Sequence, residues 1–312
     1  MTKKFWIPIF LSTAGALIAA SLFAQTSPWP FPPRADAGSG AGPGQRTVTV
    51  AFWNIQWFPG RRPASSKREE ASQIASVHAD MKQLTGDILG MEEVRDFASA
   101  TVAVQPLAGF KVDVCANFPP REGQTEAQQV AIASRLSPLS AWAEEWKPAG
   151  ALSPPRGFAF AAYQFAPRQL VLVYAVHLKS NRGEIGENTS LRQESVKQLQ
   201  SHMEAMQKAY ESLGTITWII GGDFNTAPDD PRFARETTTR SLMESGFAWS
   251  WQNMPASAHI TMPPDKGFPS ACFDHIFYRG AALRRAAVLN TSAQSSDHRA
   301  VVATLELPAR AP

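Results

Sequence analysis

Polar side chains that can bind metals or transfer protons recur along the chain, each at or near the end of a short apolar run. They are carboxylates, amides and imidazoles, contributed by segments that lie far apart in the sequence. These residues are Asn54, Glu92, Glu93, His177, Asp223, Asn225, Asp274, His275, Asp297 and His298. If the apolar runs are strands whose ends meet at one edge of stacked sheets, the polar groups converge on one cleft.

The residue types in this set indicate phosphoryl chemistry. Carboxylate and amide oxygens are ligands for hard divalent cations, and no cysteine spacing typical of a zinc site occurs. The set therefore favours Mg²⁺, with Mn²⁺ or Ca²⁺ as alternatives. A metal can offset phosphate charge, an aspartate can position a water, and a histidine with an amide can stabilise the charged oxygens of the transition state.

Hydrophobic periodicity indicates which elements position these groups. Alternating β-branched and apolar residues predict a strand over residues 47–53, and short apolar runs predict further strands. We expect these at residues 88–91, 111–115, 130–134, 157–164, 169–176, 215–220, 273–278, 286–289 and 301–305. Helical spacing predicts one helix over residues 67–84 and another from Ser190, where Ser190 and Gln193 match a capping box. Many strands and few helices, without strict alternation, favour mixed or antiparallel sheets flanked by helices.

Composition and local sequence divide the chain into four parts. A hydrophobic content of 44% excludes disorder for most of the 312 residues. Residues 1–24 begin with Lys3 and Lys4 and continue without charge, which predicts a signal peptide for export, with an uncleaved membrane anchor as the alternative. The Pro- and Gly-rich residues 25–46 predict a linker. Residues 47–307 then form one domain, and residues 308–312 a tail.

Charge and cysteine content restrict the function further. The formal net charge is +3. Removal of the predicted signal peptide, which contains Lys3 and Lys4, would leave 28 basic against 27 acidic residues. The domain therefore has no large overall field to attract nucleic acid, and local basic groups would have to do so. Cys115 and Cys272 are the only cysteines. In an exported protein such a pair predicts a disulfide, and two buried thiols are the alternative.

Six segments together resemble a known family. AFWNIQWF, DILGMEEV, YAVHLKS, IIGGDFNTAP, FDHIFY and SSDHRAVV occur in the order of the motifs of the endonuclease/exonuclease/phosphatase superfamily, which has the deoxyribonuclease-like fold. The motifs extend over nearly all of residues 47–305. The resemblance implies a four-layer αββα sandwich of two mixed, mainly antiparallel sheets flanked by helices. It also implies a divalent-metal-dependent phosphoesterase.

The resemblance assigns roles to residues that match the motifs. The implied metal ligands are Asn54, Glu93 and Asp297. The implied catalytic residues are His177, Asp223, Asn225, Asp274 and His298. Asp223 would orient or deprotonate the attacking water, Asn225 would bind a phosphate oxygen, and Asp274 would fix the imidazole of His298. Which histidine acts as the general acid stays open.

Departures from the family pattern argue against the DNA-repair branch of the family. Gln56 stands where abasic-site repair enzymes have an acidic residue, and His177 replaces an expected aromatic residue, so DNA repair is disfavoured. Glu92 stands where many members have Gln. Because alternation turns Glu92 and His275 away from their neighbours in the site, we expect both to be structural or supporting residues.

The favoured function is a secreted, bacterial-type nuclease, periplasmic or extracellular, that acts as a monomer on DNA or RNA. Lys179, Asn181 and Arg182 directly follow His177 and are predicted to bind phosphate or sugar, a plain basic loop being the alternative. No protein partner is inferred, and no stable membrane contact unless the leader is retained. Two other functions stay open: a sphingomyelinase-like or inositol-phosphate phosphoesterase, and a binding module without catalysis.

Overall fold

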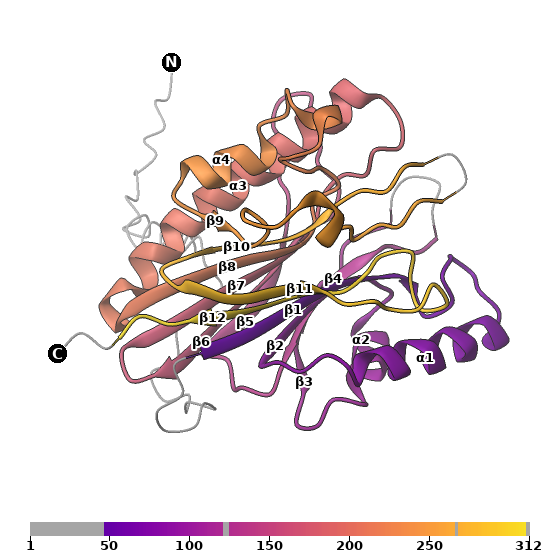
Figure 1. Cartoon of the computed structure of the whole chain (residues 1–312), viewed down its shortest axis with the longest axis horizontal. Helices are drawn as coiled ribbons and strands as arrows, with labels where there is room; N and C mark the ends of the chain where they lie inside the picture. The colour runs from indigo at the N-terminus through magenta and orange to yellow at the C-terminus, as the bar shows by residue number, and fades with distance from the viewer. Residues whose placement is uncertain (1–46, 121–124, 266–267, 310–312) are drawn as a thin grey trace, which may run out of the picture. The chain divides into compact units, whose positions relative to one another are not determined.

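A computed structural model of the chain describes residues 47–120, 125–265 and 268–309 (Figure 1). The predicted signal peptide of residues 1–24, the linker of residues 25–46 and the last three residues of the tail lie outside the described residues. Among the residues that are described, no helix combines the length and apolar character needed to cross a membrane.

The described strands form two six-stranded sheets. The strands of the first sheet are β1 (Thr47–Phe58), β2 (Ile88–Val94), β3 (Lys111–Cys115), β4 (Gln129–Ser134), β11 (Ala282–Val288) and β12 (Val301–Glu306). Those of the second are β5 (Ser140–Glu145), β6 (Gly157–Ala166), β7 (Gln169–His177), β8 (Thr215–Asp223), β9 (Ala248–Trp249) and β10 (Asp274–Arg279). Their orders are β11-β12-β1-β2-β4-β3 and β5-β6-β7-β8-β10-β9. Only β1 with β2 and β7 with β8 pair in parallel, which confirms the prediction of mixed, mainly antiparallel sheets.

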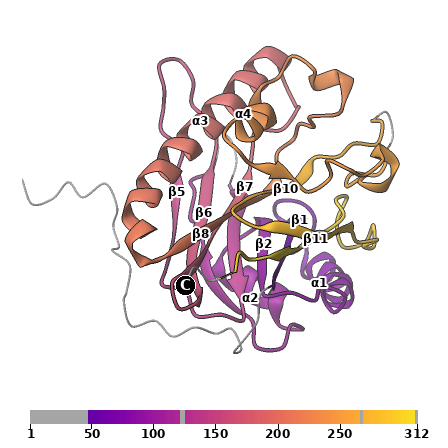
Figure 2. The ribbon, with the colours of Figure 1, turned by 60° about the vertical axis from the view of Figure 1, so that its left-hand side comes forward.

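Helices cover the outer faces of the two sheets (Figures 1 and 2). The helices α1 (Lys67–Met81) and α2 (Phe97–Val104) pack on the first sheet, and α3 (Ile185–Tyr210) and α4 (Thr238–Glu244) lie along the second. Short 3₁₀ turns, η1 (Glu211–Leu213), η2 (Pro231–Phe233) and η3 (Ala256–Ala258), occur in the connections. The layers run helix, sheet, sheet, helix, so the predicted αββα sandwich is confirmed.

The helix starts differ in how well local sequence predicts them. Helix α1 begins after Ser66, whose hydroxyl accepts the Glu69 amide hydrogen in a complete capping box. The capping box expected at Ser190 is wrong, because α3 begins earlier, at Ile185, after the cap Glu184. The Ser190 hydroxyl instead donates to the Gly186 carbonyl one turn back, at 2.9 Å. A local capping pattern inside a continuous helix therefore does not start it.

The two sheets approach closely where a phenylalanine lies between glycines of both. A Cβ at Gly90 of β2 would lie 2.2 Å from a ring carbon of Phe52, and one at Gly221 of β8 would lie 2.3 Å from another. Neither position tolerates a side chain without displacing the fully buried Phe52 ring. The glycines of DILGM and IIGGD are thus packing requirements, and they set the sheet separation directly behind the polar strand ends.

Strand directions bring the chemistry-bearing segments to one edge. Parallel neighbours β7 and β8 end together, with His177 opposite Asp223. Strand β10 is antiparallel to β8, so it starts at that edge, with Asp274 opposite Asp223. In the first sheet Asn54 pairs with Glu92 at the matching end of β1 and β2. Because β12 is antiparallel to β1, the segment before it returns to the same edge.

The predicted disulfide is wrong, because both cysteines are free thiols. Cys115 ends β3 at the edge of the first sheet, whereas Cys272 precedes β10 in the second. The Cys272 sulfur is buried beside the ring of His275, 3.7 Å from Nδ1. Burial raises the pKa of the Cys115 thiol to about 12 and that of Cys272 well above its ordinary value, so both stay protonated.

Candidate active site

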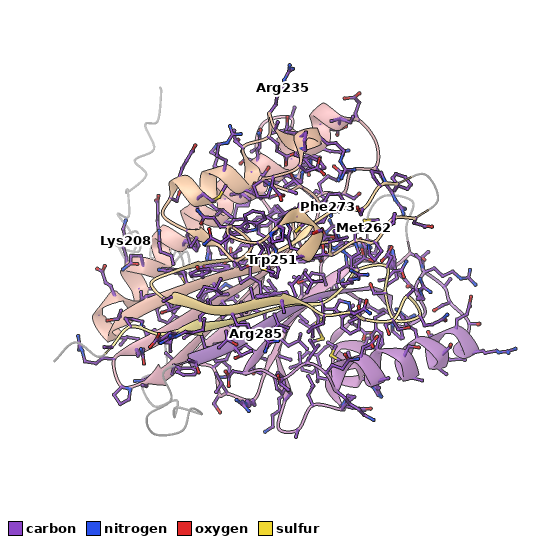
Figure 3. All side chains as sticks on the ribbon, viewed as in Figure 1. Lys208, Arg235, Trp251, Met262, Phe273 and Arg285 are labelled. Carbon is purple, nitrogen blue, oxygen red and sulfur yellow. The ribbon has the colours of Figure 1, made fainter. Side chains whose placement is uncertain are left out.

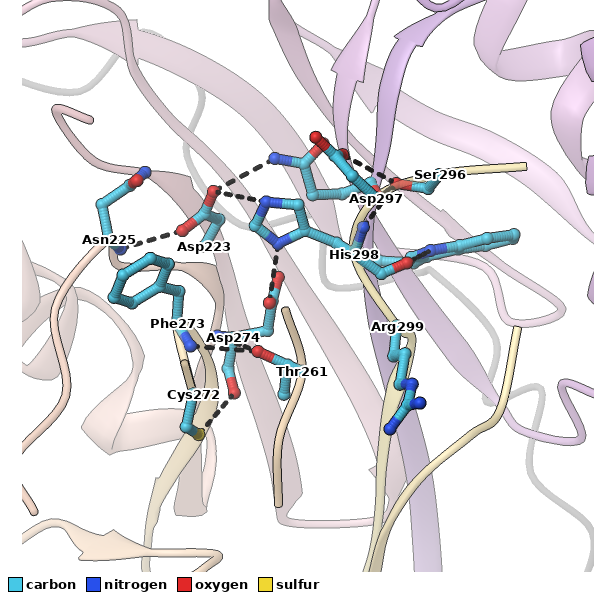
Figure 4. Close-up of polar contacts among 12 residues, drawn as sticks. Asp223, Asn225, Thr261, Cys272, Phe273, Asp274, Ser296, Asp297, His298 and Arg299 are labelled. Atoms are coloured by element: carbon cyan, nitrogen blue, oxygen red, sulfur yellow. Dashed lines mark hydrogen bonds and ion pairs between the residues drawn. The ribbon is translucent and has the colours of Figure 1, made fainter. Parts of the chain in front are cut away.

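The carboxylate of Asp223 is the centre of the polar cluster (Figure 4). It is buried at the end of β8, and its Oδ1 accepts the Asn225 amide hydrogen at 2.8 Å. Its Oδ2 accepts from Asn54 Nδ2 at 3.1 Å, and the same amide nitrogen donates to Glu93 Oε1 at 3.2 Å. Asn54 therefore joins the acidic groups of the two sheets.

Asp274 and His298 form a buried hydrogen-bonded pair beside Asp223. His298 Nδ1 lies 2.8 Å from Asp274 Oδ2, and both side chains are buried. The hydroxyl of Thr261 accepts the Asp274 amide hydrogen at 3.1 Å, and that of Ser296 accepts the His298 amide hydrogen at 3.0 Å. Both members of the pair are thus fixed through their backbones as well as through each other (Figure 4).

Two histidines lie beside the carboxylate of Asp223. Asp223 Oδ2 lies 3.6 Å from His177 Nε2 and 3.8 Å from His298 Nε2, distances suited to ion pairs but longer than hydrogen bonds. Burial alone would lower the pKa of His298, but the charges of Asp274 and Asp223 outweigh burial and raise it well above its ordinary value. Burial raises the pKa of Asp223 to about 7, against the opposing charge of His298.

Two site residues adopt a left-handed backbone conformation that side chains other than glycine rarely take. Glu93 has a φ of +61° and Asn225 a φ of +53°. Glu93 lies at an irregularity of β2 between Glu92 and Val94, and its Oε2 accepts the Trp57 amide hydrogen at 3.0 Å. Such outliers gather at functional sites, where surrounding contacts hold them.

Glu92 and His275 lie behind the site, where alternation predicts them. Both carboxylate oxygens of Glu92 are buried and have no hydrogen-bond partner among the described residues. They occupy space left by Gly222, where a Cβ would lie 2.7 Å from Oε1. Burial, and then the charges of Asp274 and Asp223, raise the pKa of Glu92 well above its ordinary value, so it is neutral. Burial lowers the pKa of His275 to about 4, so it is neutral too.

The oxygen donors of the cluster fit a hard divalent cation. Burial and the negative charge of Asp297 raise the pKa of Glu93. A cation bound by both carboxylates would remove that repulsion, and carboxylate oxygens suit such ions. Asn54 turns its amide nitrogen toward Glu93, while its oxygen accepts the Gln56 amide hydrogen at 3.0 Å. As placed, Asn54 orients the carboxylates, and it would become a ligand only with its amide reversed.

A different trio has its possible ligand atoms within 4.8 Å of one another: Asp223, Asp274 and His298. We interpret it as the acid–base part of the site, because Asp274 and His298 already use facing atoms to bond each other. Glu93 and Asp297, the predicted metal ligands, remain the oxygen donors suited to the cation.

The three predicted substrate-binding residues differ in placement. Lys179 Nζ donates to the carbonyl oxygens of Ser180 and Arg182, at 2.9 and 2.7 Å. Asn181 Nδ2 donates to the carbonyl of Asn225 at 2.7 Å, so its side chain supports the loop that carries a site residue. Arg182 is exposed. Asn181 is therefore a positioning residue in this arrangement, whereas Lys179 and Arg182 stay candidates for substrate contact.

A buried ion pair that sequence reasoning missed supports this loop. Arg192 is fully buried, and its guanidinium bonds Glu236 twice, at 2.7 and 2.6 Å. Its Nη1 also donates to Lys179 O and Asn181 Oδ1, each at 3.0 Å. A chain of contacts thus runs from Glu236 through Arg192 and Asn181 to Asn225. No local pattern around Glu236 indicates it, because its partner lies 44 residues away.

Two further side chains hold the site loops from outside the cluster. Arg156, directly before β6, donates through Nε to His177 O at 2.9 Å and through Nη2 to Leu178 O at 2.6 Å. Gln73 of α1, which has no recognisable motif, donates to the carbonyls of Ile55 and Ser295, each at 2.8 Å. It thereby links the C-terminal part of β1 to the loop before His298.

This fold and this arrangement of carboxylates, amides and imidazoles define a phosphoesterase of the αββα type. The profile of the Endonuclease/Exonuclease/phosphatase family matches residues 51–298, and the chain belongs to that family of hydrolases acting on phosphoester bonds. Family members depend on a divalent metal. No curated protein matches the sequence at a significant level.

Solved structures share the fold at low sequence identity. An endonuclease/exonuclease/phosphatase from Beutenbergia cavernae is 18% identical, with a TM-score of 0.61, over 84% of this chain and 72% of that one. A family protein from Bacteroides thetaiotaomicron is 16% identical, with a TM-score of 0.60, over 84% and 98%. TDP2 from D. rerio, complexed with a single-strand DNA product, is 15% identical, with a TM-score of 0.60, over 84% and 100%.

Proposed function

We propose that the protein is an exported, divalent-metal-dependent nuclease that hydrolyses phosphodiester bonds of DNA or RNA in the periplasm or outside the cell. The observation that carries the catalytic part is the buried Asp274–His298 pair, whose imidazole lies 3.8 Å from the carboxylate of Asp223. The likeness to TDP2 bound to single-strand DNA product supports a nucleic-acid substrate. The charge-free run after Lys3 and Lys4 supports export.

The chain's own residues supply the steps of such a reaction. The raised pKa of Asp223 suits it to orient the attacking water and accept its proton near neutral pH. His298, kept protonated by Asp274, donates to a phosphate oxygen. Asn225 uses one amide hydrogen on Leu178 O, at 3.2 Å, and can offer the other to the phosphate. His177, whose Nε2 lies 3.6 Å from the same Asp223 oxygen that His298 faces, can contact the same phosphate.

Glu93 and Asp297 would hold the cation, with Asn54 beside them. When bound, a divalent cation offsets the charge of the phosphate and of the facing carboxylates. We propose Mg²⁺, with Mn²⁺ or Ca²⁺ as alternatives, because the donors are oxygens. We further propose that the protein acts as a monomer with nucleic acid as its substrate.

A second candidate is a phosphoesterase acting on phospholipid, sphingomyelinase-like, or on inositol phosphates. Two large apolar side chains favour the lipid form. Ile185, at the start of α3, is 76% exposed, and Phe268, in the connection before β10, is 68% exposed. Exposed apolar side chains of this size could contact a membrane surface.

Incubation of the purified protein with supercoiled plasmid and Mg²⁺ tests the proposal. We expect nicking that a chelator stops and that His298→Ala abolishes. His78→Ala is the matched control, because His78 lies on α1 and contacts the carbonyl of Val102, outside the site. Parallel incubations with sphingomyelin and phosphoinositide vesicles test the second candidate. Turnover of these lipids without nicking of DNA or RNA under any divalent metal would refute the nuclease proposal.

A further inference from the structure

A cavity of about 450 Å³ lies next to the loop that follows β7, to which Lys179 belongs. Its walls include five prolines, Trp146 and Leu191, which present apolar surface. Gln128, Glu145 and Ser153 add an amide, a carboxylate and a hydroxyl. Arg156 and Lys179 complete the lining and bring positive charge to it. The cavity therefore combines apolar walls with polar and charged groups in comparable measure, which suits a ligand that has both an apolar face and polar edges.

The cavity is tied to the candidate active site through the guanidinium of Arg156. That group donates to Gln128 Oε1 in the cavity wall at 3.1 Å, and to the carbonyls of His177 and Leu178 at 2.9 and 2.6 Å. Lys179, also in the wall, is two residues from His177. A group bound in the cavity would consequently lie beside the loop that begins after His177.

The lining chemistry favours a nucleoside over the other groups that phosphoesterases release. Proline rings and the buried Trp146, which packs 5.2 Å from the Phe158 ring, offer rigid apolar surfaces to a flat heterocycle. Gln128, Glu145 and Ser153 can bond the donors and acceptors at the edge of a base. The ammonium of Lys179 suits a flanking phosphate.

The same groups disfavour an acyl chain and an inositol phosphate. An acyl chain would cover the carboxylate of Glu145 and the hydroxyl of Ser153 without offering them hydrogen bonds, which is costly. An inositol phosphate would bring extra negative charge beside Glu145. A second cavity of about 310 Å³ contains Arg61 and Arg62 together with polar groups, so it lacks comparable apolar walls.

We propose that the 450 Å³ cavity binds the nucleoside that adjoins the scissile phosphodiester. The inference rests on the proposed nuclease function and specifies where its substrate is recognised. Ser153 is an exposed part of the lining, so a larger side chain there would fill the cavity without entering the protein core.

Titration calorimetry on the full chain with Mg²⁺ tests this with two probes, dAMP and 2-deoxyribose 5-phosphate, which differ only in the base. Base stacking and edge contacts predict about 10-fold tighter binding of dAMP. Ser153→Phe should abolish that preference. Thr101→Phe is the matched control, because Thr101 is exposed on α2, which packs on the other sheet.

Equal affinities of the two probes for the wild type would overturn the inference, as would an unchanged preference in a folded Ser153→Phe protein. Tighter binding of phosphocholine than of dAMP would overturn it in favour of a lipid headgroup. The plasmid assay separates this inference from the function on which it rests. Nicking without a base preference refutes the cavity assignment alone, whereas a base preference without cleavage of any phosphodiester refutes the nuclease function and leaves a nucleoside site.

Discussion

Replacement of Asp274 by Asn tests the central pair of the site. The variant keeps the size of the side chain but removes the charge that stabilises protonated His298. A hydrogen bond to a charged group contributes about 1.5–3 kcal/mol, and the 2.8 Å separation of two buried groups places this pair in that class. If the contribution is made in the transition state, kcat falls by about 10- to 150-fold.

Steady-state hydrolysis of bis(p-nitrophenyl) phosphate with Mg²⁺ measures the effect on kcat and KM separately. We expect KM to change by less than about threefold, because Asp274 acts through His298 and does not touch the substrate. Asp87→Asn is the matched control. Asp87 is also buried and forms an ion pair with Arg135, but neither residue belongs to the candidate site.

Two results would refute this reasoning. One is a kcat for Asp274→Asn that stays within about threefold of wild type or falls no further than that of Asp87→Asn. The other concerns the double variant with His298→Ala. If Asp274 acts through His298, adding Asp274→Asn to His298→Ala should lower kcat no further. A full additional loss would show that Asp274 acts by another route.

Three further predictions concern the support of the site, the core and the metal. Arg192→Met leaves the carboxylate of Glu236 buried without its partner, and chemical denaturation should show a loss of about 3–5 kcal/mol; a loss below about 1 kcal/mol would contradict this. Burial raises the pKa of Asp113 to about 6, so the folded state holds the proton more tightly. The free energy of unfolding should then fall by up to about 3 kcal/mol as pH rises from about 4 to 6, and Asp113→Asn should remove that dependence. Mg²⁺ at 100 times its Kd should stabilise the wild type by about 2.7 kcal/mol in thermal melts. Glu93→Gln should lose this gain, and the control Glu204→Gln, at an exposed position of α3, should keep it.

Local sequence determined the elements and most of the candidate site. The alternation of residues 47–53 and the apolar runs before Glu93, His177 and Asp223 each form strands, but β1 continues five residues past its expected end, to Phe58, and β2 and β8 continue three residues past theirs. Strand periodicity depends on neighbouring residues only, so it can be read without a structure. The fold family then follows from the order of the motifs, since that order sets which strand ends meet.

Long-range packing decided what local patterns could not. A disulfide between Cys115 and Cys272 could form only if the two sheets brought them together. The sheets instead hold them apart as free thiols. The labelled Trp251, Met262 and Phe273 (Figure 3) belong to the long connection into β10, which also carries Thr261, the residue that fixes the Asp274 backbone. No periodicity or motif in that connection indicates such a contact.

Sequence alone therefore determined the residue types, the strands and the family, because these depend on local pattern and on motif order. Only the tertiary structure decided that Asn54 bridges two carboxylates and that Arg192 and Gln73 hold the loops of the site. Gln73 and Ser295 lie 222 residues apart. Contacts of this kind form between segments that meet only after the sheets have packed, so neighbouring residues carry no information about them.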